Sequence, residues 1–380
     1  MDAGATLIRR GAQAPSIRQV AAVDKQWMHG YTGDEQTANS KWQIADNKSD
    51  DKEEDRRVKA LVTGGAGFIG SHLDELLLNA GHEVVAIDDL STGSEANIRH
   101  LFGNSGFRFV LETIANEAVM DRLISECDMV FHLAAAVGVE LIVRDPVHTI
   151  ETNIMGSSIV LRVANRYRRK VILASTSEIY GKSADVPFRE DGDGVMGPTT
   201  HQRWAYANSK AMDEFLALAY HKQRGLPVVI CRFFNTIGPR QTGRYGMVVP
   251  RFVRQALRGE PLTVYGDGQQ SRCFADVADV IEAVLKLAAH PGAVGNVYNL
   301  GNTEEITIVD LAHRVIARTG SASTIAKVPY DEAYEPGFED MRRRVPDIGR
   351  AAALIGYRPR HSLDDTLDRI IAYYRTTERL

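Results

Sequence analysis

Residues 58–70 read VKALVTGGAGFIG, an apolar run that ends in a glycine-rich segment. Gly64, Gly67 and Gly70 lie between this run and the segment 71–79, whose leucines have helical spacing. A strand, a glycine turn and a helix N-terminus in this order form the phosphate-binding start of a dinucleotide fold. Gly64 allows the tight turn, Gly67 lets the backbone approach a pyrophosphate, and Gly70 permits close packing of the helix on the strand.

A carboxylate at the end of the next apolar run strengthens this prediction. Asp88 ends the run 83–88, where an acidic residue accepts hydrogen bonds from the adenosine ribose hydroxyls. Its negative charge would repel the 2′-phosphate of NADP, so we expect NAD to be the cofactor.

The chain alternates apolar runs with segments of helical pattern as far as residue 235. The further runs are 129–136, 169–176 and 227–235. Such alternation is typical of a parallel sheet covered on both faces. We therefore expect an α/β fold with a Rossmann-type, doubly wound parallel sheet.

The domain organisation follows from changes in this pattern. Residues 1–57 lack a periodic apolar pattern and end in the charged run DDKEEDRR, so we expect a disordered tail. The NAD-binding domain is expected over 58–235. A smaller mixed α/β lobe for substrate is expected over 236–380, discontinuous, with returns to the sheet near 276–301.

Composition narrows the classes of partner. The net charge of −4 at pH 7 gives no bulk attraction to nucleic acid or to an anionic membrane, and no stretch is apolar enough for a span. The three cysteines have long spacings without a CxxC pair. We therefore expect no metal site and a reducing, cytoplasmic setting.

Two further stretches contain candidate catalytic side chains. Tyr206 and Lys210, in the stretch WAYANSK, are spaced i and i+4 and should share one helix face. A nearby ammonium group would lower the pKa of the tyrosine and make it a usable base. The stretch ASTSEIYG places Thr176, Ser177 and Glu178 at the end of a buried strand. An ionised side chain at such a position is unfavourable unless it has a partner or a function.

Together, the motifs TGGAGFIGSH, HLAA, ETN, STSEIYG, YANSK, RFFNTIGPR, PLTVYGDGQQSRCF and RRRVPD resemble the extended short-chain dehydrogenase/reductase family, in its nucleotide-sugar branch. The resemblance runs from about residue 58 to about residue 375 and implies a nucleotide-sugar substrate, bound NAD and a homodimer.

The resemblance also implies roles for individual residues. Tyr206 would be the base that accepts the sugar hydroxyl proton, Lys210 would bind the nicotinamide ribose, and Thr176 would contact the reacting hydroxyl. The implied cofactor contacts are Gly64, Gly67, Phe68, Ile69, Asp88, Asp89, Leu90, Ala134 and Lys210. The implied substrate contacts are Asn235, Thr263, Tyr265, Arg272 and Arg344. After the third strand, VLETI places Thr113 where many relatives have an acidic residue near the adenine.

Glu178 bears on the reaction. Relatives of this branch oxidise C4 of the sugar, and 4-epimerases need no further carboxylate beside the threonine. Residues 176–178 read T-S-E, which resembles the corresponding stretch of UDP-glucuronate decarboxylases and of GDP-mannose dehydratases. In dTDP-glucose 4,6-dehydratases the corresponding stretch resembles T-D-E. Glu178 therefore argues against a plain 4-epimerase.

The stretch RRRVPDIGRA at 342–351 resembles the decarboxylases, in which an arginine matching Arg344 lies beside the sugar and can hold a carboxylate. Two stretches resemble other relatives: the loop AAAVGVELIVRDP at 134–146 is closer to epimerases, and Met247 replaces an arginine of many decarboxylases. A UDP-glucuronate decarboxylase is the leading interpretation. A 4-epimerase, a 4,6-dehydratase and a non-catalytic NAD-binding sensor are the alternatives.

Overall fold

The computed structural model describes residues 57–137, 145–243, 247–333 and 341–378, which belong to one compact unit. The sequence-predicted tail, apart from residue 57, lies outside the described residues. So do residues 138–144 of the loop that resembles the epimerases. Among the described helices, none combines the length and the apolar character that crossing a membrane requires.

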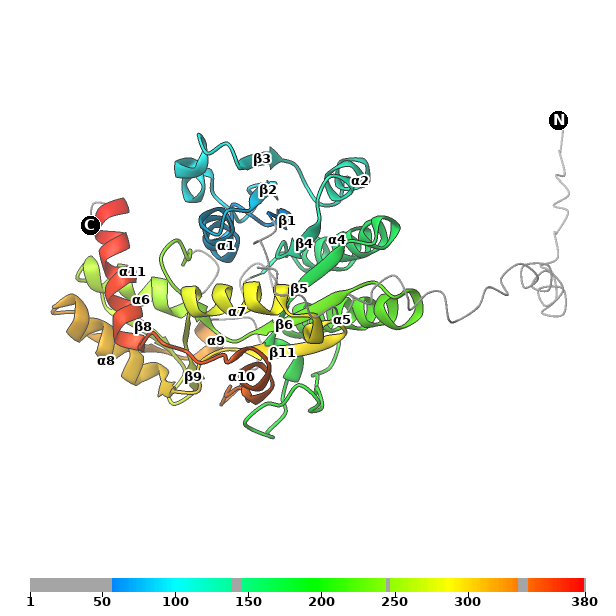
Figure 1. Cartoon of the computed structure of the whole chain (residues 1–380). Coiled ribbons are helices and arrows are strands. Elements are labelled where there is room, and N and C mark those ends of the chain that lie inside the picture. The colour runs from blue at the N-terminus through cyan, green and yellow to red at the C-terminus, as the bar shows by residue number, and fades with distance from the viewer. Residues whose placement is uncertain (1–56, 138–144, 244–246, 334–340, 379–380) are drawn as a thin grey trace, which may run out of the picture. The chain divides into compact units, whose positions relative to one another are not determined.

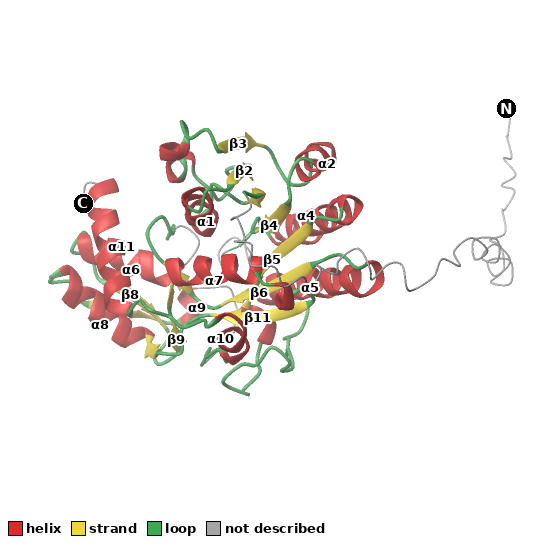
Figure 2. Ribbon diagram, viewed as in Figure 1, coloured by secondary structure: helices red, strands yellow, loops and turns green. Residues whose placement is uncertain are grey.

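Seven parallel strands form the central sheet in the order β11-β6-β5-β4-β1-β2-β3 (Figures 1 and 2). The strands are β1 (Lys59–Thr63), β2 (Glu83–Asp88), β3 (Phe107–Leu111), β4 (Met129–His132), β5 (Lys170–Thr176), β6 (Val228–Phe233) and β11 (Asn296–Leu300). The predicted doubly wound parallel sheet is confirmed.

Helices cover both faces of this sheet because its strands present apolar side chains on both sides. Along β1, Ala60 and Val62 face one helical layer, whereas Leu61 faces the other. The first layer contains α1 (Phe68–Asn79), α7 (Val277–Ala289) and α10 (Gly349–Ile355). The second contains α2 (Glu117–Ser125), α4 (Pro146–Tyr167) and α5 (Ala205–Arg224).

The C-terminal lobe has its own apolar core, in which Phe252, Leu311 and Leu367 are fully buried. Its helices are α6 (Val248–Leu257), α8 (Ile308–Thr319), α9 (Tyr330–Ala333) and α11 (Leu363–Thr377). Its strand pairs are β8 (Leu262–Tyr265) with β13 (Ile325–Val328), β9 (Ser271–Cys273) with β12 (Glu305–Thr307), and β7 (Thr236–Ile237) with β10 (Ala275–Asp276). Within the described residues, the short 3₁₀ helices are η2 (Glu95–Asn97), η3 (Arg99–Leu101), η4 (Ser177–Tyr180), η5 (Gln202–Trp204) and η6 (Pro291–Ala293).

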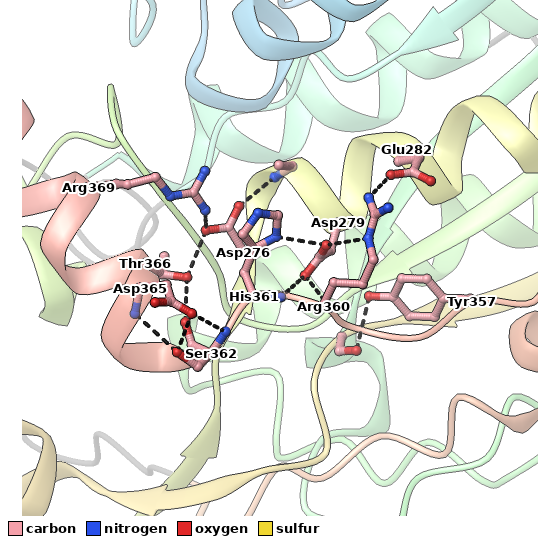
Figure 3. Close-up of polar contacts among 12 residues, drawn as sticks. Asp276, Asp279, Glu282, Tyr357, Arg360, His361, Ser362, Asp365, Thr366 and Arg369 are labelled. Carbon is pink, nitrogen blue, oxygen red and sulfur yellow. Dashed lines mark hydrogen bonds and ion pairs between the residues drawn. The ribbon is translucent and has the colours of Figure 1, made fainter.

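A buried polar cluster joins the last helix to α7 (Figure 3). The carboxylate of Asp276 caps the N-terminus of α7, accepts a hydrogen bond from Thr366 Oγ1 at 2.7 Å and ion-pairs with Arg369. One turn later, Asp279 accepts the backbone N–H groups of Arg360 at 2.9 Å and His361 at 3.0 Å. These contacts position α11 against the helix that covers the sheet.

Candidate active site

A cavity of about 530 Å³ opens at the carboxyl ends of the sheet strands and extends into the C-terminal lobe. Open α/β sheets bind ligands at this edge. Nearly all of the predicted site residues line the cavity, namely Gly64, Gly67, Phe68, Ile69, Asp88, Asp89, Ala134, Thr176, Ser177, Glu178, Tyr206, Lys210, Asn235, Tyr265, Arg272 and Arg344. Leu90 and Thr263 are not among the described residues that line it.

The glycine-rich turn between β1 and α1 leaves room only for backbone. Gly64 has φ +72°, and a Cβ there would lie 2.9 Å from the backbone nitrogen of Ala134. A Cβ on Gly70 would lie 2.1 Å from the carbonyl oxygen of Gly64. Side chains are thus excluded where a pyrophosphate would approach the helix N-terminus, so the turn fits a dinucleotide.

Asp88 ends β2 beside this turn. Its carboxylate accepts the backbone N–H groups of Ala66 at 3.1 Å and Leu90 at 2.8 Å. Burial raises the pKa of Asp88, while these two backbone hydrogen bonds lower it. The side chain is thereby fixed at the cavity wall, in the position expected for a ribose contact. Leu90 acts through its backbone, because its N–H binds Asp88 and its side chain does not line the cavity.

Thr113 also lines the cavity. This residue follows the third strand, at the position where many relatives have an acidic residue near the adenine. Its backbone N–H donates to Glu112 Oε1 at 2.9 Å, and Glu112 lines the cavity as well. An acidic side chain, that of Glu112, therefore does line the cavity wall, one residue before Thr113.

The candidate catalytic side chains come from β5 and the first turns of α5. Thr176 ends β5, accepts the backbone N–H of Glu178 at 3.2 Å and forms a side-chain hydrogen bond with Tyr206. Lys210 lies one turn after Tyr206 on α5, and both side chains are buried. Ser177 is buried and lines the cavity beside them.

The expectation that Lys210 lowers the pKa of Tyr206 is wrong for this structure. Burial raises the pKa of Tyr206, and the charge of Glu178 raises it further, whereas the hydrogen bond with Thr176 lowers it. The Lys210 ammonium instead forms an ion pair with Asp213 at 2.8 Å. Its charge is therefore largely offset by Asp213.

Glu178 lies between two arginines. Arg203 Nη1 is 2.5 Å from one carboxylate oxygen, and Arg344 ion-pairs with the other. Burial alone would raise the pKa of Glu178, but Arg344 and Arg203 outweigh it and lower the value to about 2. Glu178 is thus a carboxylate at neutral pH, and one negative charge lies between two positive charges.

The side of the cavity expected to bind substrate combines β7, β8 and β9 with the loop that contains Arg344. Asn235 precedes β7 with φ +23° and donates to the Cys273 carbonyl at 3.3 Å. Arg272 Nη1 donates to the Ser271 and Met341 carbonyls at 2.8 Å each. These contacts hold both side chains at the cavity wall.

Thr263, which was predicted as a substrate contact, binds α6 instead. Its hydroxyl accepts from Gln255 Nε2 at 3.1 Å, and its backbone N–H donates to Gln255 Oε1 at 3.1 Å. On the same strand, Tyr265 does line the cavity. Its ring lies under the guanidinium of Arg251, 4.2 Å from the ring centre.

Sequence reasoning missed Arg203 and Arg251, both of which line the cavity. For Arg203 a signal was available, because it lies three residues before Tyr206 at the entrance to α5. For Arg251, the basic and apolar pattern of α6 indicates only an amphipathic helix.

Comparisons with known proteins agree with this geometry. Residues 60–301 match the model of the family described as "NAD dependent epimerase/dehydratase family". The UDP-N-acetyl-alpha-D-glucosaminuronate decarboxylase of Bacillus cytotoxicus is 40% identical over 323 residues, which are 85% of this chain and 99% of the relative. UDP-glucuronic acid decarboxylase 1 of Danio rerio is 37% identical over 322 residues, 85% of this chain and 73% of the relative.

Among solved structures, the UDP-glucuronic acid 4-epimerase of Bacillus cereus, in complex with UDP-glucuronic acid and NAD, superposes with a TM-score of 0.75 and 33% identity. The superposition covers 83% of this chain and 99% of that chain. Family match, relatives and fold lead to one conclusion: the chain is an enzyme of the NAD dependent epimerase/dehydratase family, and NAD is its cofactor.

Proposed function

We propose that this enzyme decarboxylates a UDP-hexuronate, with UDP-glucuronate as the first candidate and UDP-xylose as its product. The observation that supports this proposal is the cluster of Arg203, Glu178 and Arg344 at the cavity wall beside Tyr206. Its net positive charge, in a buried setting, suits a substrate with an anionic group near C5. A C6 hydroxyl would not require this charge.

The first step is oxidation at C4 of the sugar. Thr176 and Tyr206 share a hydrogen bond, so both can contact one hydroxyl, and Tyr206 in its phenolate form takes the hydroxyl proton. NAD held by Gly64, Gly67 and Asp88 would supply the acceptor for the C4 hydride and the donor for its return. The products of this step are a 4-keto sugar and a proton on the Tyr206 oxygen.

The second step is loss of the carboxylate. Oxidation at C4 places a ketone β to the carboxylate, so the C5–C6 bond can break as carbon dioxide leaves and its electron pair enters the enolate. Arg344 and Arg203 hold the carboxylate and stabilise developing negative charge. C5 then takes a proton that comes from solvent, and the cycle closes when hydride returns to C4 and Tyr206 returns its proton to the C4 oxygen.

The same cluster argues against the alternatives within the family. A 4,6-dehydratase needs a base for the C5 proton, and a carboxylate whose pKa is about 2 is a weak base at neutral pH. A 4-epimerase of a neutral sugar needs neither arginine, whereas an epimerase of a UDP-uronate, such as the Bacillus cereus neighbour, binds the same anionic group, so the mass of the product decides between that reaction and decarboxylation. The intact Thr176, Tyr206 and Lys210 in the cavity argue against a non-catalytic sensor.

The test is to incubate the purified protein with UDP-glucuronate, UDP-N-acetylglucosaminuronate, UDP-glucose and dTDP-glucose, and to follow the products by mass spectrometry. The proposal expects loss of carbon dioxide from one of the two uronates, and the preferred one identifies the substituent at C2. Loss of water from a neutral sugar would establish a dehydratase. An isomer of unchanged mass would establish an epimerase.

We also propose a homodimer in the cytoplasm, where the buried thiols Cys127, Cys231 and Cys273 would stay reduced. The proposed interface is the apolar face of α4 and α5, two helices that pack against each other. This face exposes large apolar side chains, which are Val147, Ile150 and Met155 on α4 and Met212 and Phe215 on α5. Exposed apolar surface of this kind is typical of protein interfaces, and a two-fold pairing would bury it on both copies.

A further inference from the structure

A buried carboxylate that the proposed mechanism does not use lies next to the catalytic lysine. Lys210 Nζ is 2.8 Å from Asp213 Oδ2, and their side chains are 4% and 1% exposed. Both residues lie on α5, three positions apart, and Tyr206 lies one turn before Lys210. Tyr206, Lys210 and Asp213 therefore share one face of α5, and the ammonium group is ion-paired to a fixed negative charge.

Asp213 is also the end of a hydrogen-bonded chain that crosses the layer between α5 and the sheet. Ser157 of α4 binds Asp213 and lies 3.0 Å from His132 Nε2 at the end of β4. His132 Nδ1 lies 2.8 Å from the hydroxyl of Thr63, the last residue of β1. That hydroxyl accepts the backbone N–H of Ala134 at 3.1 Å. Thus Asp213 is connected to the base of the dinucleotide turn.

The protons of this chain have one consistent orientation. Burial lowers the pKa of His132 to about 3, and Lys210 lowers it as well, so the imidazole is neutral. Burial raises the pKa of Asp213, whereas the charge of Lys210 and the hydrogen bonds from Lys210 and Ser157 lower it. As the ion-paired carboxylate Asp213 only accepts, so Ser157 donates to it and accepts from His132 Nε2–H. His132 Nδ1 then accepts from the Thr63 hydroxyl. Each donor points toward Asp213, and this polarity stabilises its negative charge.

We propose that Asp213 is a positioning residue that acts through Lys210: it anchors the ammonium group and offsets its positive charge beside the nicotinamide site. The inference rests on the NAD-dependent oxidation that the family shares, and not on the proposed decarboxylation. Two consequences follow from the charge. Oxidised NAD, whose nicotinamide ring is cationic, meets less repulsion than it would beside a lone ammonium. In addition, Tyr206 becomes less acidic than a lone Lys210 would make it, consistent with the contribution of Asp213 to its pKa.

The test compares Asp213→Asn, which keeps shape but removes charge, with the unmodified protein. The affinities for NAD⁺ and NADH are measured by competition, with NADH fluorescence as the signal. We expect Asp213→Asn to weaken binding of NAD⁺ relative to NADH by about three- to tenfold, because only the oxidised ring is positive. A merely structural role would weaken both forms equally and leave their ratio unchanged. That result would overturn the proposal.

A second readout is the pH dependence of NADH formation in a single turnover with any nucleotide sugar that reduces the bound cofactor. Removal of the negative charge of Asp213 lowers the pKa of Tyr206. The acid limb of the pH–rate profile, where the rate rises with pH, should therefore move to lower pH by about 0.5–1 unit. A limb that stays in place or moves upward would contradict the charge-offset role. Asp213→Glu should restore both the affinity ratio and the limb.

Two further variants separate folding from function. Asp279→Asn removes a buried, ion-paired carboxylate on α7 and should alter neither the affinity ratio nor the acid limb. If Asp213→Asn fails to fold, Asp213→Ser removes the charge while it keeps a hydroxyl that can bind Ser157, and it should show the same two shifts. The affinity measurement needs no sugar, so its result stands whether or not the protein decarboxylates UDP-glucuronate.

Discussion

Arg344 ion-pairs with Glu178, so a loop of the C-terminal lobe supplies a charge to a site built at the end of β5. Arg203 approaches the same carboxylate from the entrance to α5. Because all three side chains are largely buried, their charges interact strongly with each other and with any anion that enters. The tests below begin with this cluster.

Replacing Arg344 with alanine, or Glu178 with glutamine, should slow product formation by about 100-fold or more, because a positioned charge partner is lost. The first oxidation should persist, so a 4-keto sugar should accumulate with reduced cofactor in at least one variant, detectable by absorbance and mass spectrometry. Arg343→Ala is the matched control, since that guanidinium is exposed and pairs with Glu305. If both site variants retain full activity, the decarboxylation mechanism is wrong.

Tyr206→Phe retains the ring but removes the group that accepts the sugar proton. We expect no reduced-cofactor absorbance on addition of substrate and a loss of turnover of at least about 100-fold. Tyr220→Phe, on the same helix, is the control for the loss of a tyrosine hydroxyl. Normal oxidation by Tyr206→Phe would show that another group is the base.

Asp88→Ala should weaken NAD binding by about tenfold, because a charged acceptor for the ribose is lost together with its bonds to the turn. The preference for NAD over NADP should narrow, as measured by calorimetry with each cofactor. Asp128→Ala provides a control, since Asp128 accepts the N–H of Lys59 at the opposite end of β1. Equal affinity of the unmodified protein for both cofactors would refute the role of Asp88.

The Glu178 cluster should make stability depend on acid pH. The pKa of this carboxyl falls from 4.5 to about 2 in the folded protein, so the folded state binds fewer protons than the unfolded state between these values. Its contribution, about 3 kcal/mol, is therefore complete above pH 4.5 and lost as pH falls toward 2. Urea unfolding at pH 5 and pH 3 should show a smaller decrease for Glu178→Gln. An equal decrease in both proteins would contradict the assignment.

The proposed dimer interface predicts a change of oligomeric state. Phe215 is 71% exposed on α5, and Met155 is 59% exposed on α4. Their replacement by glutamate should place charge in the interface and yield monomers in sedimentation velocity experiments. Leu111→Lys changes an exposed apolar residue on β3 and should leave the state unchanged. If the unmodified protein is itself monomeric in this experiment, the proposed homodimer is wrong.

The sequence alone was sufficient for the parallel sheet and the dinucleotide turn, because both depend on local patterns. Apolar runs alternate with helices along the chain, and Gly64 and Gly70 occupy positions where the backbone leaves no space for a side chain. The sequence also allowed the candidate catalytic residues Thr176 and Tyr206 to be placed near each other, since a strand end and the following helix meet at one edge of the sheet.

Charge interactions could not be predicted in this way, because they depend on packing. The spacing of Tyr206 and Lys210 gives their helix face, but it does not reveal that burial raises the pKa of the phenol or that Asp213 binds the lysine. Likewise, Thr263 occupies a strand that borders the cavity, yet its hydroxyl binds Gln255 on α6. Which neighbouring group a side chain binds is determined by tertiary packing.

The bond between Asp276 and Arg369 restricts how this enzyme can be recombined with its relatives (Figure 3). A chimaera that exchanges the chain after β11 would keep Asp276 but receive a foreign last helix. Unless that helix offers a cation where Arg369 now lies, the buried Asp276 carboxylate keeps its hydrogen bond to the start of α7 but loses its cationic partner, at a cost of about 1–3 kcal/mol. Crossover points before residue 276 keep both partners on one parental segment and avoid this penalty.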